Sequence, residues 1–279
     1  MFITRFAPSP TGHLHLGHAF SALYGFQLSQ KHHGQLLLRI EDIDKGRCRP
    51  EFETAIYDDL TWLGLDWPKP VRRQSEHMDD YAGALKRLTE MGLLYPCFCT
   101  RKQILQQAAE SSRAPHGPDG LLYPGSCRDL SDSERQNRMD HCDPYALRLD
   151  MARACSRVGA LTWHDRQRGE QQARPEMFGD VVLARKDTPT SYHLAVTLDD
   201  HLQGVTCVVR GVDLFQASHV HRLLQALLGL DVPEYDHHRL LTDEQGKRFA
   251  KRDRSVTLRE MRGRGVNPEE VLRLIGVKS

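Results

Sequence analysis

The spacing of apolar residues predicts alternating strands and helices over the N-terminal part of the chain. Short apolar runs at Ile3 to Ala7 and Gln35 to Asp44 predict two buried strands, the second parallel to the first. Helical spacing predicts helices from Gly17 to Lys31, Pro50 to Trp62 and Met78 to Met91. Strand, helix and strand in this order predict the opening of a dinucleotide-type α/β fold, whose ligand lies beyond the carboxyl ends of the strands.

The turn between the first predicted strand and helix is rich in proline, glycine and histidine. Pro8 and Gly12 exclude regular structure and hold the chain in a fixed turn. The helix that begins near Gly17 presents backbone N–H groups and the positive end of its dipole, and both attract phosphate. His15 and His18 lie at this end as hydrogen-bond donors. The turn therefore favours a nucleotide phosphate site, although a surface loop rich in proline and histidine is the alternative.

Short apolar runs in the second half of the chain predict strands of a small mixed insertion and a return to the nucleotide-binding fold. The predicted strands are Tyr145 to Leu149, Leu161 to Trp163, Asp180 to Arg185, Tyr192 to Val196, Val205 to Val209 and His238 to Leu241. The charged segment from Arg128 to His141 predicts a solvated helix. Two short helices are predicted near the C-terminal end, from Thr257 to Met261 and from Asn267 to Ile275.

Two charged residues come at the ends of buried strands. Arg210 is costly to bury there unless its guanidinium meets a carboxylate, which a substrate could supply, with Arg5 as a second cation. Pairing of Arg210 with Asp199 or Asp213 is the structural alternative. Glu41 follows the second predicted strand and is expected near the proline-rich turn, unless it only caps the strand end.

Three thiols lie on two short turns separated by a polar helix from Arg101 to Ser112. They belong to Cys97, Cys99 and Cys127. Two such turns supply the thiolates of a tetrahedral zinc site, although closely spaced cysteines also occur as ordinary buried thiols. A fourth ligand is needed, and His116 and Tyr123 are the two candidates, with imidazole the more common zinc ligand.

Composition narrows the class of protein. The chain has 279 residues, of which 39% are hydrophobic, enough for one large domain or a nucleotide-binding domain with an insertion. A formal charge of +1 excludes a global basic field, so any RNA contact must be local. Seven unevenly spaced cysteines favour a reducing compartment. Because the chain lacks both a membrane-spanning apolar segment and a signal peptide pattern, we expect a cytoplasmic protein without membrane contact. We separately expect a monomer.

The segment from Arg5 to His18 closely resembles the first signature of class I aminoacyl-tRNA synthetases, in the form used by the glutamyl branch. In that form, an Arg-Phe-Ala-Pro-Ser-Pro-Thr-Gly lead precedes a His-Leu-Gly-His box, as it does here. The resemblance covers nearly the whole chain and implies a Rossmann-like parallel-sheet fold that binds ATP with Mg²⁺, L-glutamate and tRNA. It implies catalytic roles for His15, His18 and Lys251. The residues it assigns to ATP are Pro8, Gly12, His15, Gly17, His18, Arg248 and Lys251. Those it assigns to glutamate are Arg5, Phe6, Ala7, Pro8, Ser9, Glu41, Tyr192 and Arg210.

The segment from Arg248 to Arg252 occupies the place of the second signature, usually written Lys-Met-Ser-Lys-Ser. Lys251 is retained, whereas arginine replaces the first lysine and Ala250 replaces the serine. Positive charge survives, so stabilisation of the departing pyrophosphate is expected to survive as well. Some members of the branch also bind zinc through Cys-x-Cys followed by Tyr-x-x-x-Cys. The resemblance therefore implies one structural zinc ion on Cys97, Cys99, Tyr123 and Cys127.

The resemblance also implies how the chain is divided. Residues 1–92 and 186–252 form the two halves of the catalytic domain, residues 93–185 form an acceptor-binding-like insertion with the zinc site, and residues 253–279 form a short helical extension. We expect no anticodon-binding domain, because the chain stops at Ser279.

Two departures from ordinary glutamyl-tRNA synthetases point to a more specific activity. Val196 replaces an asparagine, and Val212-Asp213-Leu214 replaces Glu-Glu-Trp. This pattern resembles a short paralogous group that activates glutamate without tRNA and transfers it to the queuosine base of tRNA(Asp). The alternatives are a minimal glutamyl-tRNA synthetase that charges the tRNA 3′ end and a non-catalytic tRNA-binding relic.

Overall fold

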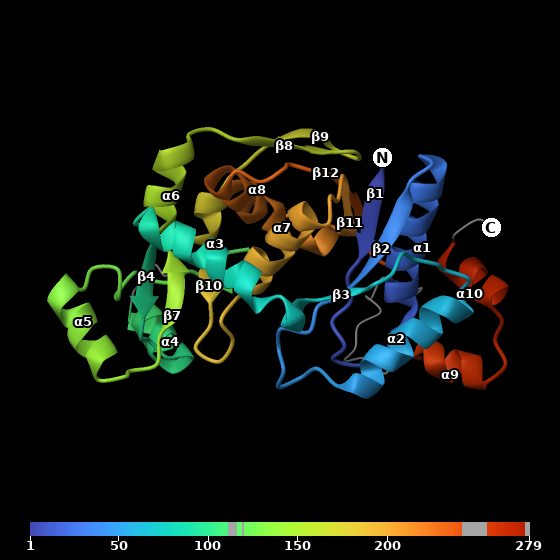
Figure 1. Cartoon of the computed structure of the whole chain (residues 1–279), viewed down its shortest axis with the longest axis horizontal. Coiled ribbons are helices and arrows are strands. Elements are labelled where there is room, and N and C mark those ends of the chain that lie inside the picture. The colour runs from blue at the N-terminus through green and yellow to red at the C-terminus, as the bar shows by residue number, and fades with distance from the viewer. Residues whose placement is uncertain (111–115, 119, 242–255, 277–279) are drawn as a thin grey trace.

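The computed structural model describes residues 1–110, 116–118, 120–241 and 256–276 of the chain. Two mainly parallel sheets lie at its centre (Figure 1). The first contains, in spatial order, β1 (Ile3–Phe6), β2 (Gln35–Ile40) and β3 (Arg72–Arg73). The second contains β11 (Cys207–Gly211), β12 (Glu234–His238), β8 (Thr162–Asp165) and β9 (Gly169–Gln172), with only β9 antiparallel to its neighbour.

The two sheets meet where β1 lies beside β11. The backbone N–H of Thr206 donates to the carbonyl of Ile3 at 3.0 Å, and Arg5 Nη1 donates to the carbonyl of Val209 at 3.0 Å. This junction places the carboxyl ends of β1, β2 and β11 next to one another, as expected for parallel strands in an open sheet. The predicted Rossmann-like parallel-sheet fold is thereby confirmed.

Helix α1 (Leu16–Lys31) packs across the junction of the two sheets. A β-carbon added at Gly25 would lie 3.4 Å from Leu36 of β2 and 3.8 Å from Val209 of β11, in ordinary van der Waals contact, so the helix packs against both strands at this position. Thr4 Oγ1 also donates to the carbonyl of Gly25 at 3.2 Å. These contacts place the middle of α1 against β1, β2 and β11.

The remaining helices build two apolar cores. One core surrounds α3 (Met78–Glu90), α6 (Met151–Val158), α7 (Tyr192–Leu202) and α8 (Ala217–Leu228). The other joins α1 and β2 to α2 (Pro50–Trp62), α9 (Leu258–Gly263) and α10 (Pro268–Ile275). Within the described ranges, no helix is both long and apolar enough to cross a bilayer.

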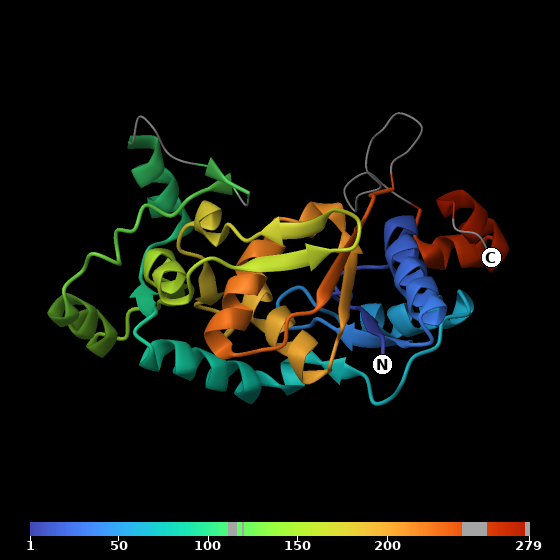
Figure 2. The same ribbon diagram turned by 90° about the horizontal axis from the view of Figure 1, so that it is seen from above.

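A separate small sheet lies at one end of the elongated molecule (Figures 1 and 2). Its antiparallel strands are β10 (Val182–Ala184), β7 (Ala146–Leu149) and β4 (Leu94–Cys97). Around it lie α4 (Arg101–Glu110), α5 (Asp132–Asp140), and the short pair β5 (His116–Gly117) and β6 (Gly120–Leu121). The cysteine-bearing turns belong to this part of the chain.

The predicted strand from Tyr192 to Val196 is wrong, because this segment begins helix α7. Ser191 has the extended backbone of a helix N-cap, and Leu194, Ala195 and Leu198 are buried at helical spacing against the core that contains α8. A five-residue apolar window could not distinguish the buried side of a helix from a strand. The helices α6 and α8 also had not been predicted.

The predicted strand from His238 to Leu241 is also wrong, since β12 ends at His238. Its register pairs Cys207 with Glu234 and Gly211 with His238. Most of β12 is polar yet buried, because the side chains of Asp236 and His237 find hydrogen-bond partners inside the protein. By contrast, the two predicted C-terminal helices are confirmed as α9 and α10.

Asp59 of α2 is a buried carboxylate at the contact between α2 and α9. Its oxygens accept no hydrogen bond in the described part of the chain, and Arg262 Nη2 lies 3.4 Å from Oδ1. Burial raises the pKa of Asp59 to about 6, and Arg262 offsets only part of this effect.

Asp59→Asn is therefore expected to raise the free energy of unfolding at pH 8 by about 2 kcal/mol, because the amide has the same shape without a buried charge. A carboxyl with a raised folded pKa stabilises the fold only when protonated, so the gain should shrink as pH falls through about 6. Urea unfolding at pH 8 and pH 5 measures it, with the exposed neighbour Asp58→Asn as control. A less stable Asp59 variant at pH 8 contradicts the prediction.

Candidate functional site

A cavity of about 380 Å³ opens at the carboxyl ends of β1, β2 and β11. Its lining includes every residue that the sequence assigned to glutamate: Arg5, Phe6, Ala7, Pro8, Ser9, Glu41, Tyr192 and Arg210. These residues come from β1 and the turn after it, the end of β2, the start of α7 and the end of β11. The structure therefore brings the set together, while the role of each residue stays a prediction.

Arg210 is buried at the edge of this cavity, and uncharged groups hold it. Its Nε donates to His237 Nε2 at 3.1 Å and its Nη2 donates to Ser218 Oγ at 2.7 Å. Nη1 lies 3.2 Å from His221 Nδ1 and 3.5 Å from the Tyr192 hydroxyl. Among the described residues, no carboxylate pairs with this guanidinium. A buried cation so arranged is suited to an anionic ligand.

Asp199, one suggested partner of Arg210, faces a different set of groups. Its carboxylate accepts from Arg72 Nε and from Gln74 Nε2, both at 2.8 Å. The Tyr81 hydroxyl donates to the same carboxylate at 2.9 Å. Asp199 thus anchors α7 to β3 and α3 and leaves Arg210 to other contacts.

Arg5 and Arg39 lie beside the cavity and share one carboxylate. Asp200 Oδ1 accepts from Arg5 Nε at 2.9 Å and from Arg39 Nη1 at 2.8 Å. Arg39 Nη2 also donates to Glu41 Oε1 at 3.1 Å. Burial raises the pKa of Glu41 and outweighs the opposing effect of Arg39 and Arg5, so a bound ammonium group would favour the ionised carboxylate. Most of the hydrogen-bonding capacity of Arg5 is used within the protein.

A second cavity of about 350 Å³ adjoins the N-terminal end of α1. Three residues assigned to ATP, His15, Gly17 and His18, line it together with residues of β12 and the segment after it. His18 also lines the first cavity, so the two cavities share this side chain in their walls. Gly12, which was also assigned to ATP, lines neither cavity.

His15 and His18 cap α1 reciprocally. His15 Nδ1 accepts from the backbone N–H of Gly17 at 3.1 Å, and His18 Nδ1 accepts from the backbone N–H of His15 at 3.2 Å. Because Nδ1 is an acceptor in both rings, the ring proton of each neutral imidazole belongs on Nε2, which is then a donor. The arrangement orients two ring donors at the positive end of a helix dipole, which suits an anionic phosphate.

The second-signature residues Arg248, Ala250 and Lys251 lie outside the described residues. The chain that follows them is anchored at the site: Thr257 forms an antiparallel bridge with His15, and the N–H of Leu258 donates to the carbonyl of Leu14 at 2.8 Å. The start of α9 is thus attached to the residues that cap α1.

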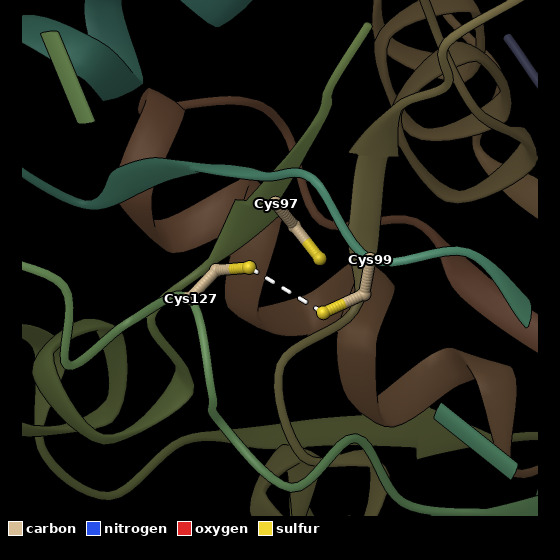
Figure 3. Close-up of side chains that lie close together, drawn as sticks. All are labelled: Cys97, Cys99 and Cys127. Atoms are coloured by element: carbon tan, nitrogen blue, oxygen red, sulfur yellow. Dashed lines mark hydrogen bonds between the residues drawn. The ribbon is translucent and has the colours of Figure 1, made fainter. Parts of the chain in front are cut away.

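Three thiols converge at the small sheet, as Figure 3 shows. The sulfur atoms of Cys97, Cys99 and Cys127 lie within 4.8 Å of one another, and those of Cys99 and Cys127 are 3.5 Å apart. The Tyr123 hydroxyl lies 3.6 Å from Cys99 Sγ and accepts from the N–H of Cys127 at 2.8 Å. His116, the other candidate, is not part of this group.

The surroundings of these thiols favour a thiolate at Cys127 and oppose one at Cys97, whose pKa is raised to about 12 by its hydrogen bond with Cys127 and by burial. A hydrogen bond from Cys97, assisted by Tyr123 and the N–H of Phe98, lowers the pKa of Cys127 to about 6 against the effect of burial. The guanidinium of Arg148 lies over the Tyr123 ring, 3.9 Å from its centre. The group can therefore hold a metal ion through sulfur ligands.

Several residues at the cavities were missed from the sequence. Ser21 lines both cavities and has no distinctive pattern, and Leu214, which also lines both, was noted only as part of the replacement at Val212-Asp213-Leu214 and was not assigned to a site. Arg39 and Asp200 lie behind the first cavity. Adjacent acids inside an apolar segment, as at Asp199 and Asp200, are a usable signal, because buried carboxylates need cationic or hydrogen-bonding partners.

The solved structures most relevant to this site are glutamate enzymes. The glutamate tRNA ligase of Elizabethkingia meningosepticum, in complex with its amino acid, is 30% identical with a TM-score of 0.74, covering 90% of this chain and 52% of that one. The glutamate-tRNA synthetase of Elizabethkingia anophelis is 30% identical with a TM-score of 0.77, covering 90% and 53%. The chain thus spans about half of each structure.

Among curated proteins, the chain is 50% identical over 280 residues to a glutamyl-Q tRNA(Asp) synthetase of Rhodobacter capsulatus, covering 99% of this chain and 100% of the relative. It is 45% identical over 271 residues to the protein of the same name from Nocardia farcinica, covering 97% and 82%. Residues 1–278 match the family model described as tRNA synthetases class I (E and Q), catalytic domain. The chain belongs to this family of ligases, the class I tRNA synthetases of the glutamate and glutamine group.

Proposed function

We propose that the chain activates L-glutamate with ATP, without needing tRNA, and transfers it to the queuosine base of tRNA(Asp). The observation that carries this proposal is the buried Arg210 without a carboxylate partner among the described residues, in a cavity that also contains Glu41. A cation and an acid in one cavity suit a ligand with a carboxylate and an ammonium group. The names of the relatives with 50% and 45% identity support the acceptor.

The proposed activation step requires positioning and charge neutralisation. A carboxylate oxygen of glutamate attacks the α-phosphorus of ATP in line, a P–O bond forms, and pyrophosphate leaves with the electrons of the broken bond. The ring N–H groups of His15 and His18 and the N-terminus of α1 stabilise the phosphate charge. Lys251 is proposed to act on the departing pyrophosphate, and Mg²⁺ accompanies ATP as its counter-ion.

The decisive experiment measures glutamate-dependent ATP–pyrophosphate exchange in the absence of tRNA, followed by transfer of labelled glutamate. We expect exchange with glutamate alone, and labelling of tRNA(Asp) that contains queuosine but not of tRNA(Asp) that lacks it. Labelling that ignores queuosine and follows tRNA(Glu) would identify a minimal glutamyl-tRNA synthetase. Absence of exchange would favour the non-catalytic tRNA-binding relic.

For the thiol group we infer one structural zinc ion held by Cys97, Cys99, Tyr123 and Cys127. The convergence of three sulfur atoms and the nearby Tyr123 hydroxyl support it, because thiolates are preferred zinc ligands. When bound, the ion would brace the small sheet and contribute to folding.

Cys97→Ala is expected to reduce the metal content from about one zinc ion per chain to nearly none, since removal of a ligand opens the site. Elemental analysis after gel filtration measures the content, and thiol titration measures protection of the remaining cysteines. Cys142→Ser is the matched control, because Cys142 is exposed and lies outside the thiol group. Metal-free wild-type protein with fully reactive thiols would contradict the inference.

We also propose that the protein acts in the cytoplasm as a monomer. The free thiols support a reducing environment. Gel filtration with light scattering tests the monomer, and a dimeric mass would contradict it.

A further inference from the structure

We propose that Asp165 and His237 are positioning residues that aim Arg210 at the ligand carboxylate through a fixed chain of hydrogen bonds. This inference rests on the proposed function, in which the cation Arg210 binds a carboxylate of glutamate. Arg210 lies on β11, His237 on the neighbouring strand β12, and Asp165 on β8, the strand after that. The chain of hydrogen bonds therefore crosses three adjacent strands of the sheet, starting at the cavity.

The hydrogen bonds of His237 with Asp165 and with Arg210 determine which of its ring nitrogens carries the proton. Asp165 Oδ2 lies 2.6 Å from Nδ1, and Arg210 Nε donates to Nε2 at 3.1 Å. A guanidinium N–H cannot accept, so Nε2 must be the acceptor and Nδ1 must carry the proton that it donates to Asp165. A protonated imidazole would direct a second donor at Arg210. Burial and the charge of Arg210 lower the pKa of His237 to about 2, in agreement with a neutral ring.

Backbone N–H groups in turn hold the carboxylate of Asp165 in place. Its Oδ1 accepts from the backbone N–H groups of Gln167 and Arg168, both at 3.0 Å, in the turn between β8 and β9. Asp165 and the His237 side chain are fully buried. The carboxylate therefore has a single orientation, and it transmits that orientation to the imidazole.

The other contacts of Arg210 complete its placement. Ser218 Oγ accepts from Nη2, and His221 Nδ1 lies beside Nη1. Because Nη1 can only donate, His221 Nδ1 accepts and the ring proton of His221 belongs on Nε2, which lies 3.2 Å from His193 Nδ1. Neutral acceptors thus hold the guanidinium of Arg210 without neutralising its positive charge. A carboxylate in the place of His237 would neutralise Arg210 and weaken its attraction for an anionic ligand.

The test changes which ring nitrogen of His237 carries the proton. In Asp165→Asn, the amide can donate to Nδ1, which moves the ring proton to Nε2 and directs a donor at Arg210. In ATP–pyrophosphate exchange, we expect the KM for glutamate to rise about 10- to 100-fold, with the KM for ATP unchanged and discrimination against glutamine reduced. His237→Phe should show the same pattern. His219→Gln is the control. His219 lies on α8 and is buried like His237, but its Nδ1 accepts from Trp163 Nε1 and from the backbone N–H of Arg174.

A measurement on the unaltered protein complements the variants. Nitrogen-15 NMR of the imidazole rings should show His237 as the Nδ1–H tautomer, without titration between pH 5 and pH 9. The Nε2–H tautomer, a titrating ring, or an unchanged KM for glutamate in folded Asp165→Asn would overturn the inference alone. Wild-type protein that neither binds glutamate in calorimetry nor supports exchange would overturn the proposed function, and this inference with it.

Discussion

Asp200→Asn is expected to lower the free energy of unfolding by about 3–5 kcal/mol and to eliminate glutamate-dependent exchange. Asp200 lies between the guanidinium groups of Arg5 and Arg39, both of which are buried. The amide retains one acceptor but removes the negative charge. The buried guanidinium groups of Arg5 and Arg39 would then repel each other, with less negative charge nearby to offset the repulsion.

The pH dependence provides an independent check on this prediction. Burial opposes ionisation of Asp200, but Arg5 and Arg39 outweigh it and hold its pKa below the ordinary value. A carboxylate with a lowered folded pKa stabilises the fold above its unfolded pKa of about 4, and this contribution is lost as pH falls through the folded value. The difference between wild type and variant should therefore be full at pH 7 and shrink in acid.

Urea unfolding at a series of pH values measures both effects. Asp231→Asn is the matched control, because Asp231 pairs with His201 at 3.0 Å on the surface, where ion pairs contribute little. Equal stabilities of the Asp200 and Asp231 variants at pH 7 would show that the buried cluster does not hold the cavity together.

Arg210→Lys is expected to reduce kcat/KM for glutamate about 100- to 1,000-fold while the protein stays folded. Lysine keeps the charge, but its ammonium group cannot replace a planar guanidinium held at Nε and both terminal nitrogens. The loss should be largest for glutamate, because an uncharged analogue does not depend on the cation in the same way.

The measurement compares exchange with glutamate and with glutamine at varied concentrations, and follows ATP affinity separately. Arg222→Lys, on α8, is the control, because its Nε donates to the carbonyl of Thr162 and it does not line the cavity. An Arg210 variant that retains the wild-type preference for glutamate would exclude Arg210 as the carboxylate ligand.

The N-terminal signature could be read from the sequence because its residues are contiguous. One strand, one turn and one helix cap place Arg5, Pro8, His15 and His18 close to one another, and distant parts of the chain then complete the cavities around them. Local rules of proline, glycine and helix termini are sufficient there. For the same reason, the thiol group could be predicted from two short turns.

The surroundings of Arg210 could not be predicted in the same way. His237 and Asp165 reach it from different strands, and their burial is visible only once the sheet order is known. The polar segment at β12 resembles a surface strand, because its hydrogen-bond partners are absent from the local sequence. The apolar start of α7 is similarly ambiguous, since only packing against α8 distinguishes its helix from a strand.

The carboxylate pair on α7 has a consequence for how the protein folds. Arg5 and Asp200 are separated by 195 positions in the chain, and Arg72 and Asp199 by 127. Contacts of this separation close long loops, and their entropy cost delays them relative to helices and neighbouring strands. Either apolar core can begin to form from shorter-range contacts, but the cavity appears only when the two parts of the chain dock. Binding competence should thus be among the last properties gained during folding and among the first lost when one half opens.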